Sequence, residues 1–180
     1  MKKHMKYNLT GLLAVALLTF LDQWTKHLAV LHLKDQNPFV LWEGVFEFNY
    51  LENRGAAFGI FQGQRAIFLV CTILILGLVA FCYYRLPEDR HFHPIRLVGI
   101  LLVAGAIGNM IDRVANSFVV DFFYFKLIDF PVFNVADCYV TVGAALLAFL
   151  ILFYYKEEEL GFLFGKNQKN EADDGAEEKI

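Results

Sequence analysis

Residues 117–139 read SFVVDFFYFKLIDFPVFNVADCY and place Asp121 and Asp137 in otherwise apolar and aromatic surroundings. The stretch connects two hydrophobic segments that are each long enough to cross a bilayer. Ionisable side chains in or beside a membrane are costly, and they are retained mainly where they form pairs or perform chemistry. We therefore predict that the two carboxylates form one catalytic pair, which the other segments anchor and orient.

The segment that follows Asp137 is predicted to be a membrane helix from about residue 135 to residue 155. Asn134 stands at an N-cap position, and Asp137 lies three residues further on, in the first turn. The free N–H groups and the positive end of the helix dipole there favour an ionised Asp137. For Asp137 alone, an acid that only completes the cap is a competing interpretation. It does not account for Asp121, which follows two valines in a strand-like segment.

The composition indicates an integral membrane protein. Of the 180 residues, 57% are hydrophobic and 19% are charged, and the mean hydropathy is +0.45, which excludes a soluble domain of ordinary composition. Three more membrane helices are expected at about 9–31, 66–84 and 95–111. The 95–111 segment is rich in glycine and alanine, so a neighbouring helix can approach it closely. Residues 1–155 are thus a four-helix membrane domain, followed by an acidic, disordered tail at 156–180.

Residues 32–65, between the first two helices, are polar and aromatic. The run Phe46–Leu51 alternates in the manner of a strand, so a small sheet on the membrane surface is expected there. The segment Asn53–Gly59 follows, and its small residues permit close backbone approach. It suits either a loop packed on a helix or an edge offered to an extended peptide.

The distribution of Lys and Arg predicts the orientation of the chain. The N-terminus, the loop from Arg85 to Arg96 and the tail carry ten of these residues, against five in the other two connections. This bias places both termini in the cytoplasm and the two acids at the extracytoplasmic face.

Asp22 and Lys26 lie four residues apart near the outer end of the first helix. They share a helix face and can neutralise each other. The alternative is a pair whose side chains extend to the membrane surface.

No metal or cofactor site is expected. The cysteines show no CxxC spacing, and His91 and His93 lack further ligands nearby, which favours a solvated loop. The net charge of −3 is carried mostly by the tail and argues against nucleic acid as a partner.

Two neighbouring carboxylates can share one proton, so that one activates a water while the other protonates a carbonyl. This solution to amide hydrolysis requires no metal and no nucleophilic side chain. It suits a sequence without HExxH, GxSxG or a Ser-His or Cys-His arrangement.

Five ordered motifs in this sequence resemble those of lipoprotein signal peptidase, also called signal peptidase II. They are Asp22-Gln23-x-x-Lys26, Asn53-x-Gly55-Ala-Ala-Phe58, Gly105-Ala-Ile-Gly-Asn109-x-Ile-Asp112-Arg113, Val120-Asp121-Phe122 and Phe133-Asn134-x-Ala-Asp137. The match extends from Leu9 to Tyr155, and two departures are visible, Ala104 in place of a glycine and Cys138 in place of a serine.

The resemblance implies a four-helix membrane aspartyl endopeptidase of the bacterial cytoplasmic (inner) membrane. Such an enzyme removes the signal peptide of a prolipoprotein just before its lipid-modified cysteine, and it is sensitive to the cyclic peptide globomycin. It implies Asp121 and Asp137 as the catalytic dyad and residues 32–65 as a cradle for the substrate. The residues implied to support substrate and dyad are Asp22, Lys26, Asn53, Gly55, Asn109, Asp112, Arg113 and Asn134, with Asp22 and Lys26 bracing the first helix.

Three other functions remain open on the residues alone. A metal-dependent lipid phosphotransferase or phosphatase would hold Mg²⁺ with Asp112, Asp121 and Asp137. A proton-coupled transporter subunit would use Asp22, Lys26 and the two acids Asp121 and Asp137 as a relay, although the acids gather at one face and no inverted repeat is visible. In a structural membrane protein the acids would only cap helices and form ion pairs.

Overall fold

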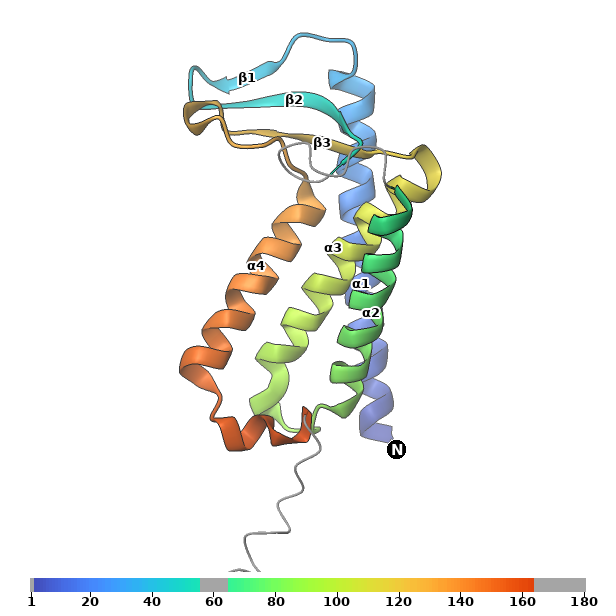
Figure 1. Cartoon of the computed structure of the whole chain (residues 1–180), viewed down its shortest axis with the longest axis vertical. Coiled ribbons are helices and arrows are strands. Elements are labelled where there is room, and N and C mark those ends of the chain that lie inside the picture. Colours follow the sequence, from blue (N-terminus) through green and yellow to red (C-terminus); the bar gives the residue numbers. More distant parts are fainter. Residues whose placement is uncertain (1, 56–64, 164–180) are drawn as a thin grey trace, which may run out of the picture.

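The computed structural model describes residues 2–55 and 65–163, and Figure 1 shows their arrangement. The long helices are α1 (Lys2–Leu33), α2 (Arg65–Arg85), α3 (His93–Asn116) and α4 (Val135–Phe149), the last continued by a π-helical turn, η4 (Leu150–Tyr154). The strands are β1 (Phe39–Trp42), β2 (Phe46–Asn53) and β3 (Val119–Tyr124). Three short 3-10 helices complete this part of the chain, η2 (Arg90–Phe92), η3 (Lys126–Ile128) and η5 (Glu157–Leu163).

The four long helices run side by side, and the sheet lies across one end of them (Figure 1). The central helix is α3, which packs against α1, α2 and α4. The N-terminus and η5 lie at the opposite end. We refer to these two ends as the sheet end and the far end.

Within residues 2–55 and 65–163, three helical segments are long and apolar enough to cross a membrane, namely 65–85, 90–116 and 135–154. They agree with the predicted second, third and fourth spans. α1 is not among them, and its second half carries Asp22, Gln23 and Lys26. The part of the chain that the structure describes thus contains three helices able to cross a membrane, and the predicted count of four spans is not confirmed by it.

The sheet is antiparallel, in the order β1-β2-β3. The strand predicted at Phe46–Leu51 is confirmed, and it extends to Asn53 as β2. The pairing of β2 with β3 sets Leu51 opposite Asp121 and Asn53 opposite Val119, with an irregularity between Phe48 and Leu51. The register thus brings the last residue of β2 close to the acid on β3.

Glycines explain how closely α3 approaches α4. A Cβ atom at Gly105 would lie 2.5 Å from the Ala136 carbonyl oxygen and 2.7 Å from Val140 Cγ2. At Gly143 of α4, it would lie 3.2 Å from Leu102 Cδ2. The close approach predicted from the small residues of 95–111 is therefore confirmed.

Two predictions at the far end differ from the structure. The segment at His91 and His93 is not a loop, since residues 90–92 form η2 and His93 begins α3, although His93 is exposed as predicted. The tail predicted to be disordered from residue 156 begins with a helix, η5, because the half-buried Leu160 packs on a core that includes Leu86 and Tyr155. Residues 164–180 lie outside the described part of the chain.

Candidate active site

One asparagine joins the two acids on which the predicted pair depends. Asp121 lies on β3 and Asp137 lies in the first turn of α4. Asn134 donates from Nδ2 to Asp121 Oδ1 at 2.6 Å, and its Oδ1 accepts the Asp137 N–H at 3.0 Å. The Asn134 N–H in turn donates to Asp137 Oδ2 at 3.2 Å, which completes a capping box. The predicted N-cap is therefore confirmed, and the cap residue also contacts the second acid.

Two further asparagines donate to the acids. Asn53 Nδ2 lies 2.8 Å from Asp121 Oδ2, and Asn109 Nδ2 lies 2.7 Å from Asp137 Oδ1. The Gly55 N–H donates to Asn53 Oδ1 at 3.0 Å. Because Asn53 Oδ1 is an acceptor for this N–H, its Nδ2 faces the carboxylate. Each acid is thus held by side-chain amides from separate parts of the chain.

The site favours a proton on Asp121. Its side chain is 1% exposed, and burial is the main cause that raises its pKa from 3.8 to about 7. The negative charge of Asp137 raises this pKa further, whereas hydrogen bonds from Asn53 and Asn134 and the charge of Lys26 oppose the shift. A carboxyl group with a pKa near neutrality is suited to general acid and base chemistry.

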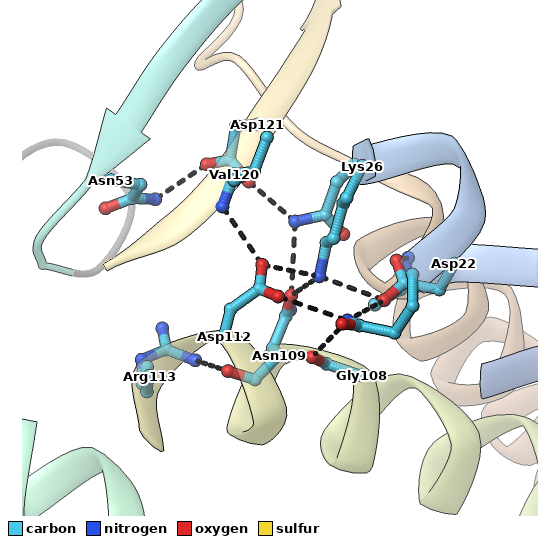
Figure 2. Close-up of polar contacts among 12 residues, drawn as sticks. Asp22, Lys26, Asn53, Gly108, Asn109, Asp112, Arg113, Val120 and Asp121 are labelled. Carbon is cyan, nitrogen blue, oxygen red and sulfur yellow. Dashed lines mark hydrogen bonds and ion pairs between the residues drawn. The ribbon is translucent and has the colours of Figure 1, made fainter. Parts of the chain in front are cut away.

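A buried ion cluster of Asp22, Lys26 and Asp112 lies near Asp121, as Figure 2 shows. Lys26 Nζ lies 2.9 Å from Asp22 Oδ2 and 3.1 Å from Asp112 Oδ2. The ion pair predicted from the spacing of Asp22 and Lys26 is therefore confirmed. The alternative, a pair that extends to the membrane surface, is wrong, because Lys26 is 3% exposed and Asp22 is fully buried.

The cluster also contacts the backbone beside both acids. Asp112 Oδ2 accepts the Val120 N–H at 3.1 Å, and Asp22 Oδ1 accepts the Ala136 N–H at 2.8 Å. Lys26 donates to Asn109 Oδ1 at 2.9 Å. Hydrogen bonds and ion pairs thus connect the two acids with the predicted supporting residues of α1, of α3 and of the start of α4.

Arg113 follows Asp112 on α3, and its side chain contacts Phe68 of α2. Its Nη1 is 3.4 Å from the Asn109 carbonyl oxygen, and its guanidinium lies 4.7 Å from the centre of the Phe68 ring. The charges of Asp137, Asp121 and Asp112 act on it, so it contributes a positive field to the site.

Two residues of the cluster were not among the predicted site residues. Gln23 Nε2 lies within 3.2 Å of Asp22 Oδ2, 3.1 Å of Asp112 Oδ1 and 3.1 Å of the Gly108 carbonyl oxygen. A Cβ atom at Gly108 would lie 2.5 Å from Asp22 Oδ2. Both residues occur inside the quoted motifs, so the motifs contained a signal for them.

Among the described residues, no group of three or more His, Cys, Asp or Glu side chains is arranged to hold a metal ion. The three cysteines are free, and Cys138, next to Asp137, is half-buried.

Known proteins resemble this chain over most of its length. The sequence profile of the family described as Signal peptidase (SPase) II matches residues 14–153. A lipoprotein signal peptidase of Streptococcus thermophilus is 43% identical over 145 residues, which cover 81% of this chain and 92% of that protein. Another from Caldanaerobacter subterraneus is 40% identical over 144 residues, covering 79% of this chain and 96% of that protein.

Two solved structures share the fold. A bacterial membrane enzyme determined by the in meso method at 2.3 Å resolution superposes with a TM-score of 0.71, at 29% identity over 89% of this chain and 93% of that one. A second, at 1.9 Å resolution, gives a TM-score of 0.69 at 31% identity, over 81% of this chain and 94% of that one. On the profile match and on these relatives, the chain is a membrane protein that belongs to the signal peptidase II family.

Proposed function

We propose that this protein is an aspartyl endopeptidase that removes the signal peptide from diacylglyceryl-modified prolipoproteins and cuts before the lipidated cysteine. The observation that carries the proposal is the link through Asn134, which donates to Asp121 and caps the helix turn that holds Asp137. The family membership supports the substrate class.

In the proposed reaction, Asp137 is the base and Asp121 is the acid. A water between them attacks the scissile carbonyl carbon, passes one proton to Asp137 and becomes bonded to that carbon, while Asp121 gives its proton to the carbonyl oxygen. The tetrahedral intermediate then collapses, Asp137 protonates the leaving amine, and Asp121 recovers a proton from the hydroxyl. The raised pKa of Asp121 supports its role as the acid, and the helix N-terminus at Asp137 supports a negative charge there.

The contacts of Asp112 favour the peptidase function over that of a metal-dependent lipid phosphotransferase or phosphatase. That alternative requires Asp112 as a metal ligand beside Asp121 and Asp137. In the structure, Asp112 Oδ2 is instead within bonding distance of Lys26 Nζ and the Val120 N–H. A cation and a hydrogen-bond donor at this oxygen compete with a metal ion.

The proposal includes the placement in the membrane. We take α1 as a fourth span, because it packs along α3 and its charged residues Asp22 and Lys26 are paired and buried inside the protein. With both termini in the cytoplasm, as the Lys and Arg counts indicate, the sheet end faces the extracytoplasmic side. The proposal extends to contacts with membrane lipids and to inhibition by globomycin.

The test is cleavage of a diacylglyceryl-modified prolipoprotein by the purified protein in detergent with excess EDTA. Wild type should cut before the lipidated cysteine, whereas Asp121→Asn and Asp137→Asn should each lose at least about 1,000-fold in rate, because each removes one partner of the proton transfer. All three proteins should elute alike in size-exclusion chromatography. A wild type that is inert until Mg²⁺ is restored would contradict the proposal, as would an active asparagine variant.

The pH dependence follows from the pKa of Asp121. The active pair holds one proton, so cleavage should fall about tenfold per pH unit as the pH rises through about 7, where Asp121 loses that proton. Burial raises this pKa in the folded state, so the stability that Asp121 contributes is full below about 3.8 and is lost as the pH rises through about 7. Rates and melting temperatures across this range check both trends. In Asp121→Asn the melting temperature should lose this part of its pH dependence, and an unchanged dependence would contradict the assignment.

A further inference from the structure

The Lys26 ammonium is held in one position, because each of its N–H groups donates to an acceptor of the site. Its ammonium carries three N–H groups, and three acceptors surround it, namely Asp22 Oδ2 at 2.9 Å, Asp112 Oδ2 at 3.1 Å and Asn109 Oδ1 at 2.9 Å. The side chain is 3% exposed, so water does not replace these partners. The ammonium is therefore held in one position, and the groups bound to it are held in fixed positions relative to one another (Figure 2).

The two carboxylates bound to Lys26 each hold the backbone next to one catalytic acid. Asp22 Oδ1 accepts the N–H of Ala136, the residue before Asp137, at 2.8 Å. Asp112 Oδ2 accepts the N–H of Val120, the residue before Asp121, at 3.1 Å. The start of α4 and the start of β3 are thus both bound by carboxylates that pair with the same ammonium.

Lys26 also determines how the Asn109 amide is oriented. Asn109 Oδ1 accepts from Lys26 Nζ and from Asn134 Nδ2, the latter at 3.1 Å. An ammonium only donates, so the amide presents its oxygen to Lys26 and its Nδ2 to Asp137. The amide therefore donates to the Asp137 carboxylate, which stabilises the charged form that the proposed base requires.

We propose that Lys26 is a positioning residue of the peptidase reaction, which sets the relative placement of Asp121 and Asp137 through Asp22, Asp112 and Asn109. The inference rests on the proposed function. It assigns Lys26 more than the bracing of the first helix that the family resemblance implies. A purely structural ion pair would stabilise the fold without altering the chemistry of the dyad.

The test compares Lys26→Met with wild type, using the same lipidated substrate and normalising rates to the folded protein recovered from size-exclusion chromatography. We expect kcat to fall about 100-fold with little change in KM, because the reacting groups shift relative to each other while the substrate cradle stays intact.

The second readout is the pH profile of the cleavage rate. If Lys26 only stabilised the fold, its removal would not shift this profile. The charged groups around Asp121 are Asp137 of α4, Lys26 and Asp22 of α1, and Asp112 and Arg113 of α3. Lys26 favours the ionised form of Asp121, so its removal should move the basic limb of the profile to higher pH. The matched control is Lys156→Met at the far end, since Lys156 is an exposed lysine outside both the site and the substrate cradle, and its loss should leave kcat and the limb unchanged.

A second variant, Lys26→Met with Asp22→Asn, removes both charges of the buried pair and keeps the side-chain volumes, so that folding is less at risk. It should show the same loss of kcat. Wild-type kcat and an unshifted limb in either folded variant would overturn the inference, and so would failure of both variants to fold, which assigns Lys26 to stability alone. If wild type itself does not cut the substrate, the proposed function fails; if it cuts and the folded Lys26 variants match it, only this inference fails.

Discussion

In the described part of the chain, a basic side chain is buried at each end of the helix bundle, and the two ends hold it in different ways. At the sheet end, Lys26 lies between two carboxylates, Asp22 and Asp112. At the far end, Arg96, 6% exposed, donates from Nη2 to the carbonyl oxygens of Leu86 and Pro87 at 3.1 and 2.9 Å. Its guanidinium lies 5.2 Å from the centre of the Tyr7 ring and 5.1 Å from that of Tyr83.

The two cations therefore have different roles: Lys26 acts on titratable groups, whereas Arg96 caps the carbonyl groups at a helix end. Lys26 donates to Asn109, which in turn donates to Asp137, and its positive charge favours the ionised form of Asp121. Arg96 satisfies carbonyl groups at the end of α2 and joins α1, α2 and α3 through aromatic contacts. We therefore expect changes at the sheet end to alter catalysis, and changes at the far end to alter stability.

The largest effect in this comparison is expected from Gly108→Ala at the sheet end. The added Cβ would lie 2.5 Å from Asp22 Oδ2 and 3.2 Å from Ala136 Cβ, so Asp22 must move away from Lys26 and from the start of α4. Cleavage should fall about 100-fold, since displacements of about 1 Å at a catalytic site have effects of this size. The change should also destabilise the fold by about 1–3 kcal/mol.

Gly77→Ala on α2 is the matched control, because apart from neighbouring residues and backbone of its own helix no described atom lies within 4 Å of the added Cβ. Alanine favours helix more than glycine, so this variant should be active and equally or slightly more stable. Rates per folded molecule and melting temperatures in detergent check both variants. Full activity in Gly108→Ala would show that the site tolerates a displaced Asp22.

A smaller and different effect is expected from Arg96→Met at the far end. The loss of two charged hydrogen bonds to buried carbonyl groups should destabilise the protein by about 2–3 kcal/mol. The rate per folded molecule and the pH profile should match wild type, because Arg96 contacts no group of the site. The melting temperature and the pH profile of cleavage separate these outcomes. A shifted pH profile in Arg96→Met would contradict the expectation that the far end affects stability and not catalysis.

Much of the sheet end could be predicted from sequence because its signals are local. The Asn134 cap, the Asp22 and Lys26 spacing and the alternation in Phe46–Leu51 each lie within a few residues, and the structure contains all three features. The contacts that connect them are not local. Lys26 and Asn109, for example, are 83 residues apart, and only the packing of α1 on α3 brings them together.

The far end was predicted less well, for a related reason. Composition alone suggested a solvated loop at His91 and a disordered tail after residue 155. The structure forms η2 and η5 instead, because the two segments pack on each other and on the ends of α3 and α4. His91 stacks on Tyr154 with ring centres 5.0 Å apart, a contact across 63 residues that no local pattern indicates.

The smallest effect is expected from Glu159→Gln in η5. Glu159 Oε1 lies 3.0 Å from His91 Nε2, and both side chains are about one-third exposed, so solvent weakens the pair. Oε2 accepts the Lys156 N–H at 2.9 Å, which is the main cause that lowers the pKa of Glu159. Glutamine keeps an acceptor for this N–H and removes only the charge. The melting temperature should change by less than about 2 °C at neutral pH, with cleavage unchanged.

The pH dependence makes this last comparison sharper. A lowered pKa means that the stability from Glu159 is present above its ordinary value of 4.5 and is lost as the pH falls through the folded-state value. Wild type and Glu159→Gln should therefore converge in melting temperature on acidification. Residue 159 lies beyond the segment 14–153 that matches the family profile, so any change in cleavage here would reveal a coupling of this added helix to the sheet end. Unchanged cleavage would leave the far end with a structural role, as its carbonyl-bound arginine indicates.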